Sequence, residues 1–203
     1  MSEQAFESAT ETDPVEALRA GTWSLLGRLL MGPPDAETLG RLVEVGSAGP
    51  AGDAIGEAWQ RLGEAARTAR DDALQREYQD VFIGVGGGEI TPYSSWYLRG
   101  MLADRPLIEL RDDLAALGIE MGEGCSETED HAGAICETMA FVIVDEDVDP
   151  DWQRDLFRRH VDSWMGRLFE DIGKAPSADF YRAVAALGEA FVALERRVYA
   201  MSA

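Results

Sequence analysis

Apolar side chains recur every three or four residues along most of this chain, which is the spacing of an amphipathic helix. The first run follows Asp13-Pro14, a capping residue and a proline suited to the first helical position, and it ends before Gly32-Pro33-Pro34. The last run follows Ser177, a candidate cap, and comprises Phe180, Val184, Leu187, Phe191, Leu194 and Val198. Each run predicts one helix.

Similar patterns fill the sequence between these runs. Helices are predicted after capping residues at Asp35, Asp53, Asp104 and Asp149, from about residue 68 to residue 82, and after the capping box Ser126-Glu127-Thr128-Glu129. The helix that starts at Asp149 carries Leu156, His160, Trp164 and Leu168 on one face. The sequence therefore predicts an all-α protein. It is a single helical-bundle domain of about eight helices over residues 13–203, after a flexible N-terminus at residues 1–12.

The composition predicts a cytoplasmic protein with a large core. Of the 203 residues 46% are hydrophobic, yet no apolar run reaches the roughly 20 residues needed to span a bilayer. The acidic start of the chain lacks the basic and apolar regions of a secretory signal. Two cysteines, Cys125 and Cys136, are too few for a disulfide framework and lack zinc-site spacing.

The formal net charge is -20, from 38 acidic and 18 basic residues. Binding of nucleic acid needs a basic surface, so we expect no nucleic-acid partner. Two interpretations of the acidic surface stay open. It can attract a cationic partner, or it can keep the protein soluble in high salt, where charges are screened.

Residues 77–97, EYQDVFIGVGGGEITPYSSWY, also allow two interpretations. VFIGVGGG resembles a buried strand that runs into a phosphate-binding glycine loop. However, the full G-x-G-x-x-G spacing is absent, no lysine follows, and the next residues do not open a helix. The positions Leu74, Tyr78, Val81 and Phe82 instead form a helical stripe. We therefore expect the glycines to end a helix and to form a mobile loop, followed by aromatic residues that can line a groove for a peptide.

No catalytic or metal-binding pattern can be assembled from the sequence. The chain has 2 histidines, no HExxH motif, and no supported Ser-His-Asp arrangement. The acidic run at residues 145–151 lacks the glycine and distal glutamate of an EF-hand loop, which favours a solvated turn. We therefore expect no catalytic residues, no metal site and no cofactor.

Several motifs, taken together and in order, resemble one protein family. The first is E-Y-x-x-[LV]-F-x-G, a glycine loop and P-Y-x-S-x-Y, within residues 77–97. The second is Glu127-Thr128-Glu129-Asp130-His131, and the third is Phe157-x-x-His160-Val161-x-x-Trp164, with Phe180-Tyr181 near the end. Over roughly residues 15 to 200 the chain resembles the TorD/DmsD family of redox-enzyme maturation chaperones.

This resemblance implies a single all-α domain that is a cytoplasmic chaperone and not an enzyme. Such a chaperone binds the twin-arginine signal peptide, the body, or both, of a molybdenum-cofactor oxidoreductase, and holds it for cofactor insertion before export. The matching positions imply a peptide-binding site composed of Tyr78, Phe82, Pro92, Tyr93, Ser95, Tyr97, Glu127, Asp130 and His131. The chain departs from the family pattern at Val81, Thr91, Val161 and Ser163, which bears on partner specificity more than on the fold.

The chemistry of these residues suits a peptide with two arginines followed by an apolar stretch. Carboxylates such as Glu127 and Asp130 can bind a guanidinium group, and a spacing of three places them on one face of a helix. The aromatic loop can bury the apolar part of the peptide. Acidic residues at a helix N-terminus also stabilise the helix by themselves, and His131 can equally be a hydrogen-bonded core residue.

Two other functions stay open from the sequence. A helical assembly factor can bind the mature catalytic subunit of a membrane-anchored oxidoreductase without recognising a signal peptide. A nucleotide-dependent switch is the third candidate, although no nucleotide site can be assembled here. We expect no stable membrane insertion, and either a monomer or a homodimer that exchanges helices across residues 84–91.

Overall fold

The computed structural model describes residues 13–48, 52–84, 86–120, 122 and 127–201. Within them the chain forms ten α-helices and one short π-helical turn, and the prediction of an all-α fold is confirmed. The elements are α1 (Pro14–Met31), α2 (Ala36–Ala48), α3 (Ala54–Thr68), α4 (Asp71–Tyr78), the π turn (Gln79–Ile83), α5 (Ser94–Arg99), α6 (Arg105–Ala116), α7 (Ala132–Val144), α8 (Pro150–His160), α9 (Met165–Lys174) and α10 (Phe180–Met201).

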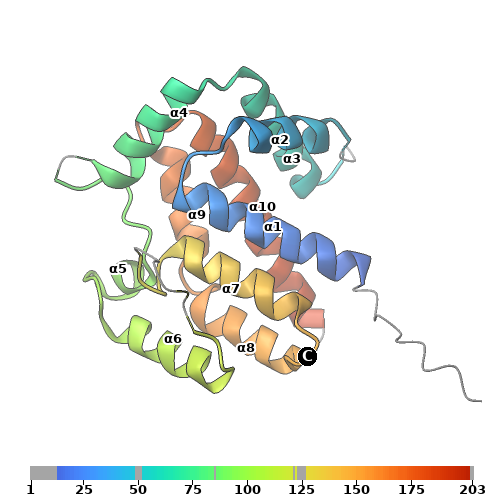
Figure 1. Cartoon of the computed structure of the whole chain (residues 1–203), viewed down its shortest axis with the longest axis vertical. Helices are drawn as coiled ribbons and strands as arrows, with labels where there is room; N and C mark the ends of the chain where they lie inside the picture. Colours follow the sequence, from blue (N-terminus) through green and yellow to red (C-terminus); the bar gives the residue numbers. More distant parts are fainter. Residues whose placement is uncertain (1–12, 49–51, 85, 121, 123–126, 202–203) are drawn as a thin grey trace, which may run out of the picture.

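Helix α1 runs through the middle of the bundle (Figure 1). It packs along α7, while α2 and α3 form a pair that lies against α10, and α9 packs along α10. Helices α5, α6 and α8 lie at the end of the bundle opposite α2 and α3 (Figure 1). In the described part of the chain, no helix is both long enough and apolar enough to cross a membrane.

The contact between α1 and α7 depends on two glycines. A Cβ atom added at Gly133 would lie 2.6 Å from Cγ of Met31 and 3.0 Å from the carbonyl oxygen of Gly27. A Cβ atom added at Gly27 would lie 3.0 Å from the carbonyl oxygen of Gly133. Because neither position has room for a side chain, the two helices touch backbone to backbone, and this contact places the start of α7.

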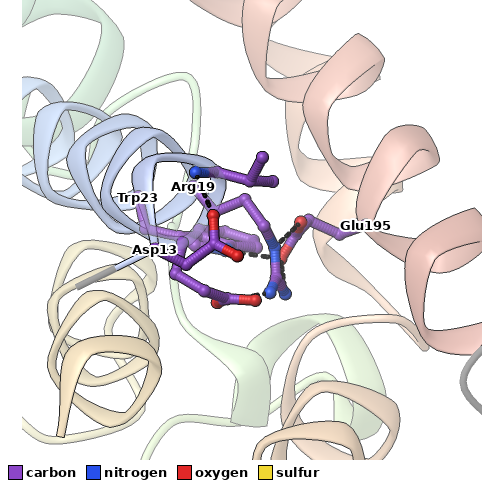
Figure 2. Close-up of polar contacts among 6 residues, drawn as sticks. Asp13, Arg19, Trp23 and Glu195 are labelled. Atoms are coloured by element: carbon purple, nitrogen blue, oxygen red, sulfur yellow. Dashed lines mark hydrogen bonds and ion pairs between the residues drawn. The ribbon is translucent and has the colours of Figure 1, made fainter. Parts of the chain in front are cut away.

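A buried ion pair links α1 to α10. Arg19 donates hydrogen bonds from two guanidinium nitrogens to the two carboxylate oxygens of Glu195, at 2.7 and 2.9 Å. Trp23 Nε1 donates to the same carboxylate at 3.0 Å. Figure 2 shows Arg19 and Trp23 reaching from α1 toward Glu195. Glu195 is 0% exposed and Arg19 is 7% exposed, so each buried charge depends on its partner. Arg19 also donates to the partly exposed Glu16 at 2.7 Å.

The predicted capping residues at Asp13, Asp35, Asp53, Asp104 and Asp149 are confirmed. Each carboxylate accepts a hydrogen bond from a backbone N–H near the start of its helix, at 2.7 to 2.8 Å. These bonds satisfy N–H groups that have no partner inside the helix. The local chemistry of these aspartates therefore sets where the five helices begin.

Two predicted helix boundaries were wrong. The helix expected from about residue 68 begins at Asp71, because Thr68 ends α3 and the two residues between are extended. The single helix expected from Asp149 through Leu168 is two helices, α8 and α9. They are separated by a turn at residues 161–164, where Trp164 Nε1 donates to the His160 carbonyl at 2.7 Å. Neither break contains glycine or proline, so no local signal predicts it.

The predicted cap of the last helix was also wrong. Helix α10 begins at Phe180, and its first N–H groups bond to Glu77, which belongs to α4. The Glu77 carboxylate accepts from the backbone N–H groups of Asp179, Phe180 and Tyr181 at 2.7, 3.2 and 2.7 Å. Ser177 instead donates from its N–H and its hydroxyl to Glu89, at 3.1 and 2.7 Å. A side chain distant in sequence thus replaces the local cap.

Candidate peptide-binding site

Tyr78 and Phe82 lie at the end of α4 and in the π turn, as the helical stripe predicted. Their rings are 5.1 Å apart, and both pack on Tyr181 of α10, at 5.9 and 5.0 Å between centroids. The Tyr78 hydroxyl donates to the Leu30 carbonyl at 3.2 Å, and burial raises the pKa of Tyr78 to about 12. These two residues therefore join α4 to α1 and α10, with Tyr78 only half-buried.

The glycine segment folds back onto the π turn. Glu89 and Ile90 donate their N–H groups to the carbonyls of Asp80 and Val81, at 3.3 and 2.8 Å. A Cβ atom added at Gly88 would lie 2.4 Å from the Phe82 carbonyl carbon and 2.6 Å from the Val81 oxygen. Glycine is therefore required there by close backbone approach. The prediction that the chain is helical before the glycines is confirmed, while Val85 lies outside the described residues.

Residues 92–97 differ from the predicted loop, because residues 94–99 form the short helix α5. Just before α5, the chain pairs with the segment that precedes α7. Ala132 donates to the Pro92 carbonyl at 2.7 Å, and Ser94 donates to the Asp130 carbonyl at 2.9 Å. Tyr93 and His131 form an antiparallel bridge between these two bonds. Two motifs that lie far apart in sequence therefore meet along one short stretch of backbone.

Asp130 is the acceptor that begins α5. Its side chain is 0% exposed, and its carboxylate accepts from the Ser95 N–H at 3.1 Å and from the Thr128 hydroxyl at 2.6 Å. The Ser95 hydroxyl is buried as well and accepts from the Asp104 N–H at 3.3 Å. Both oxygens of Asp130 are thus hydrogen-bonded within the protein, and the residue holds α5 against the start of α7.

Glu127 and His131 surround the ring of Tyr93. The Tyr93 hydroxyl donates to Glu127, and the edge of the His131 ring meets the Tyr93 ring at a centroid distance of 5.0 Å and an interplanar angle of 81°. Burial and the hydrogen bond to Glu127 raise the pKa of Tyr93. Burial lowers the pKa of His131, and its Nδ1 accepts from the Gly133 N–H at 3.0 Å, which leaves the proton on Nε2.

The predicted helical face with Glu127 and Asp130 was wrong. Helix α7 begins at Ala132 with His131 as its cap, so both acids lie in the turn before the helix. That turn is stabilised by the His131 N–H, which donates to the Thr128 carbonyl at 3.0 Å. Ser126 of the expected capping box and Cys125 lie outside the described residues. The turn and the backbone bridge bring both acids to the start of α5, where Glu127 bonds to Tyr93 and Asp130 to Ser95.

Tyr97 faces a different neighbour, helix α9. Its hydroxyl donates to Asp171 at 3.0 Å, its ring packs on Trp164 at 5.4 Å, and its carbonyl accepts from Arg167 at 2.8 Å. Burial and the bond to Asp171 raise the pKa of Tyr97. Tyr97 therefore lies on the side of α5 that faces α9, whereas Tyr93 contacts Glu127 and His131 on the side that faces α7. Sequence reasoning missed Asp171, which lies outside the motifs, and Glu77, which opens the first motif but received no role.

The carboxylates of this region share one property. Glu77, Glu89, Glu127, Asp130 and Asp171 hydrogen-bond to backbone N–H groups and to hydroxyls of serine, threonine or tyrosine. In the described part of the chain, none of them lies within 4.0 Å of a basic nitrogen. Their charge is therefore held in place without being neutralised, and the region is electronegative.

A family model described as "Nitrate reductase delta subunit" matches residues 50–170, which contain all nine site residues implied by the sequence motifs. The chain belongs to this family. The resemblance to the TorD/DmsD family that was stated from the sequence motifs is confirmed, because curated relatives of this chain carry those names.

One relative, named "Probable Tat proofreading chaperone DmsD", comes from Haemophilus influenzae and is 28% identical over 116 residues, which are 56% of each chain. A second, named "Chaperone protein TorD", comes from Vibrio parahaemolyticus and is 26% identical over 171 residues, which are 77% of each chain. The match thus spans little more than half of the first relative. Both names describe chaperones, in agreement with the family that the sequence motifs indicated.

The fold has a counterpart among solved structures. An Archaeoglobus fulgidus protein, proposed to act in redox enzyme maturation, superposes with a TM-score of 0.59 at 18% identity. The superposition covers 94% of this chain and 99% of the other. At this identity the comparison supports the all-α fold and not the function.

Proposed function

We propose that this protein is a cytoplasmic chaperone for a molybdenum-cofactor oxidoreductase. It binds the twin-arginine leader of the oxidoreductase, its body, or both, and holds it for cofactor insertion before export. The observation that carries the proposal is the backbone bridge between Tyr93 and His131, which joins the two family motifs into one electronegative, aromatic surface. The names of the TorD and DmsD relatives support the same role.

In this proposal five of the nine candidate residues have one of two tasks. Glu127, Tyr93 and Tyr78 are partly exposed and contact the peptide. Asp130 and His131 are buried, so they hold the start of α5 and of α7 and thereby orient the contacting residues. A guanidinium group pairs with Glu127, which has a hydroxyl partner and, among the described residues, no ion-pair partner. The aromatic rings cover apolar atoms of the peptide.

Co-expression with a molybdenum oxidoreductase subunit tests this function. We expect the tagged chaperone to capture the full-length subunit, and to capture less of a variant whose two leader arginines are replaced by glutamine. Glu127→Gln should reduce capture, whereas Glu120→Gln, an exposed acid on the loop after α6, should not. Failure to capture the subunit with or without its leader would refute the chaperone proposal.

A second candidate function is assembly of the mature subunit without leader recognition. It is favoured by one observation: Asp130, which the sequence proposed for guanidinium binding, is 0% exposed and fully hydrogen-bonded. The same co-expression experiment separates the two. Equal capture of the full-length subunit and of a leaderless subunit would support the assembly function and exclude leader binding.

A further inference from the structure

A hollow in the surface lies between the glycine segment, α5 and α9. It is lined by residues 88–91, Trp96, Tyr97 and Asp171. Trp96 is 46% exposed, so one large aromatic side chain of the lining is open to a ligand. This hollow is separate from the Tyr93–Glu127–His131 contacts, which lie on the side of α5 that faces α7.

Two carboxylates of the hollow have neutral partners. Glu89 accepts from the N–H and hydroxyl of Ser177, and Asp171 accepts from the Tyr97 hydroxyl. The cations near the hollow form their hydrogen bonds with other groups, although the charge of Lys174 also interacts with Asp171. Arg167 donates to the Tyr97 carbonyl with its guanidinium 5.8 Å from the Tyr97 ring centroid, and Lys174 pairs with Glu170 at 2.5 Å. The two acids therefore retain charge that a cationic ligand can neutralise.

The chain next to the hollow exposes an unusual number of apolar side chains. From Trp96 onward, α5, the following turn and the start of α6 expose Trp96, Leu98, Met101, Leu102 and Ile108, by 38% to 60%. In the same segment, Ala103 has a φ of 55°, a backbone conformation that residues other than glycine rarely adopt. Exposed apolar side chains gathered on one segment are typical of an interaction surface.

We propose that the hollow holds one guanidinium group of the client's leader, and that residues 96–108 cover the apolar stretch that follows the arginines. The proposal rests on the proposed function and adds a subsite whose residues Glu89, Trp96 and Asp171 received no role from the family motifs. Glu89 and Asp171 supply the negative charge, and the exposed Trp96 ring lies over the cation. In the leader, the arginines precede the apolar stretch. Along this segment of the chaperone, the hollow at Trp96 likewise precedes the exposed apolar side chains that continue to Ile108 in α6.

The test uses a synthetic peptide with an Arg-Arg pair followed by a leucine-rich stretch, titrated into the whole protein by calorimetry. The double variant Glu89→Gln and Asp171→Asn should bind about tenfold more weakly, since each lost bond involves a charged group. A matched control removes a neutral partner and keeps both acids: Ser177→Ala should bind within about twofold of the unaltered protein.

The apolar half of the surface is tested separately. Trp96→Ala should weaken binding about tenfold, whereas Phe141→Ala, which removes a ring 49% exposed on α7, should not. A peptide with Gln-Gln in place of Arg-Arg should bind the unaltered protein and the double variant equally, because the lost charge has no partner. Affinity for the Arg-Arg peptide should also fall less steeply with salt in the double variant.

The outcomes separate this inference from the proposed function. If the unaltered protein binds the Arg-Arg peptide and the double variant and Trp96→Ala bind it equally well, the subsite is wrong and leader binding stands. If the unaltered protein binds neither this peptide nor a full-length client, the proposed function fails and the subsite fails with it. Binding by Ser177→Ala as weak as that of the double variant would also overturn the charge assignment.

Discussion

Carboxylates in two regions of this molecule are held in opposite ways. Glu195, between α1 and α10, accepts two bonds from Arg19 and one from Trp23, and it is completely enclosed. The carboxylates around α5, such as Asp130 and Asp171, accept from N–H and hydroxyl groups. Glu195 is thus paired with a cation, while the carboxylates around α5 have neutral hydrogen-bond donors.

This difference shows what each region can do. A buried, neutralised pair fixes how two helices lie together and offers nothing to a ligand. A carboxylate bound to neutral donors also fixes the backbone, but its charge still acts on a cation that approaches. The acidic groups around α5 can therefore hold the fold locally and attract a basic peptide at the same time.

The largest expected effect is in the first region. Glu195→Ala removes the fully buried partner of Arg19 and leaves its guanidinium only the partly exposed Glu16, so we expect the free energy of unfolding to fall by about 3–5 kcal/mol. Urea denaturation measures the change. The control is Glu37→Ala, which removes the exposed ion pair with Arg41 and should have little effect. Equal stability of the two variants would contradict the importance of the buried pair.

A smaller loss is expected at Asp130. Asp130→Asn places an amide where the Ser95 N–H and the Thr128 hydroxyl both donate, and one donor loses its acceptor. We expect a loss of about 1–3 kcal/mol in unfolding free energy, together with weaker peptide binding. Asp112→Asn, at an exposed position on α6, is the matched control. A variant as stable as the control would show that Asp130 does not hold α5.

Removal of the distant cap should cost somewhat less. Glu77→Ala takes the acceptor away from three N–H groups at the start of α10, so we expect a loss of about 1–2 kcal/mol. Gln75→Ala, an exposed neighbour on the same helix, should change the unfolding free energy little. If the two variants unfold at the same urea concentration, the cap contributes nothing measurable.

The smallest expected effect depends on pH. Burial lowers the pKa of His131 below its usual 6.5, so the unfolded chain binds the proton more readily than the folded protein. This contribution to stability is present above pH 6.5 and is lost as the pH falls through the lower, folded pKa. His160 acts in the same direction, because burial lowers its pKa too.

Urea denaturation at pH values on both sides of 6.5 checks this sign. His131→Asn keeps a residue that can cap α7 and removes the titrating group. We therefore expect its unfolding free energy to decline less between the two pH values than that of the unaltered protein. A decline as steep as that of the unaltered protein would assign the pH dependence to other groups.

Much of the fold was predictable because its signals are local. Five aspartates each cap the helix that follows them, and the helical stripe through Tyr78 and Phe82 correctly excluded a strand before the glycines. Part of the candidate site was also predictable, since the motif residues Tyr93 and Glu127 do meet. What failed was the geometry inferred for Glu127 and Asp130, because helical spacing was assumed where the chain makes a turn.

The amino-acid sequence alone determined the helical class, most helix starts, the acidic charge and the family resemblance, since caps, apolar periodicity and motifs act over a few neighbouring residues. Only the tertiary structure decided which carboxylate received which partner. Glu77 and Ser177 show this. The local Ser177 was the expected cap of α10, yet the first N–H groups of that helix donate to Glu77 of α4. A hydrogen bond depends on distance in space, and the packing of distant helices sets that distance.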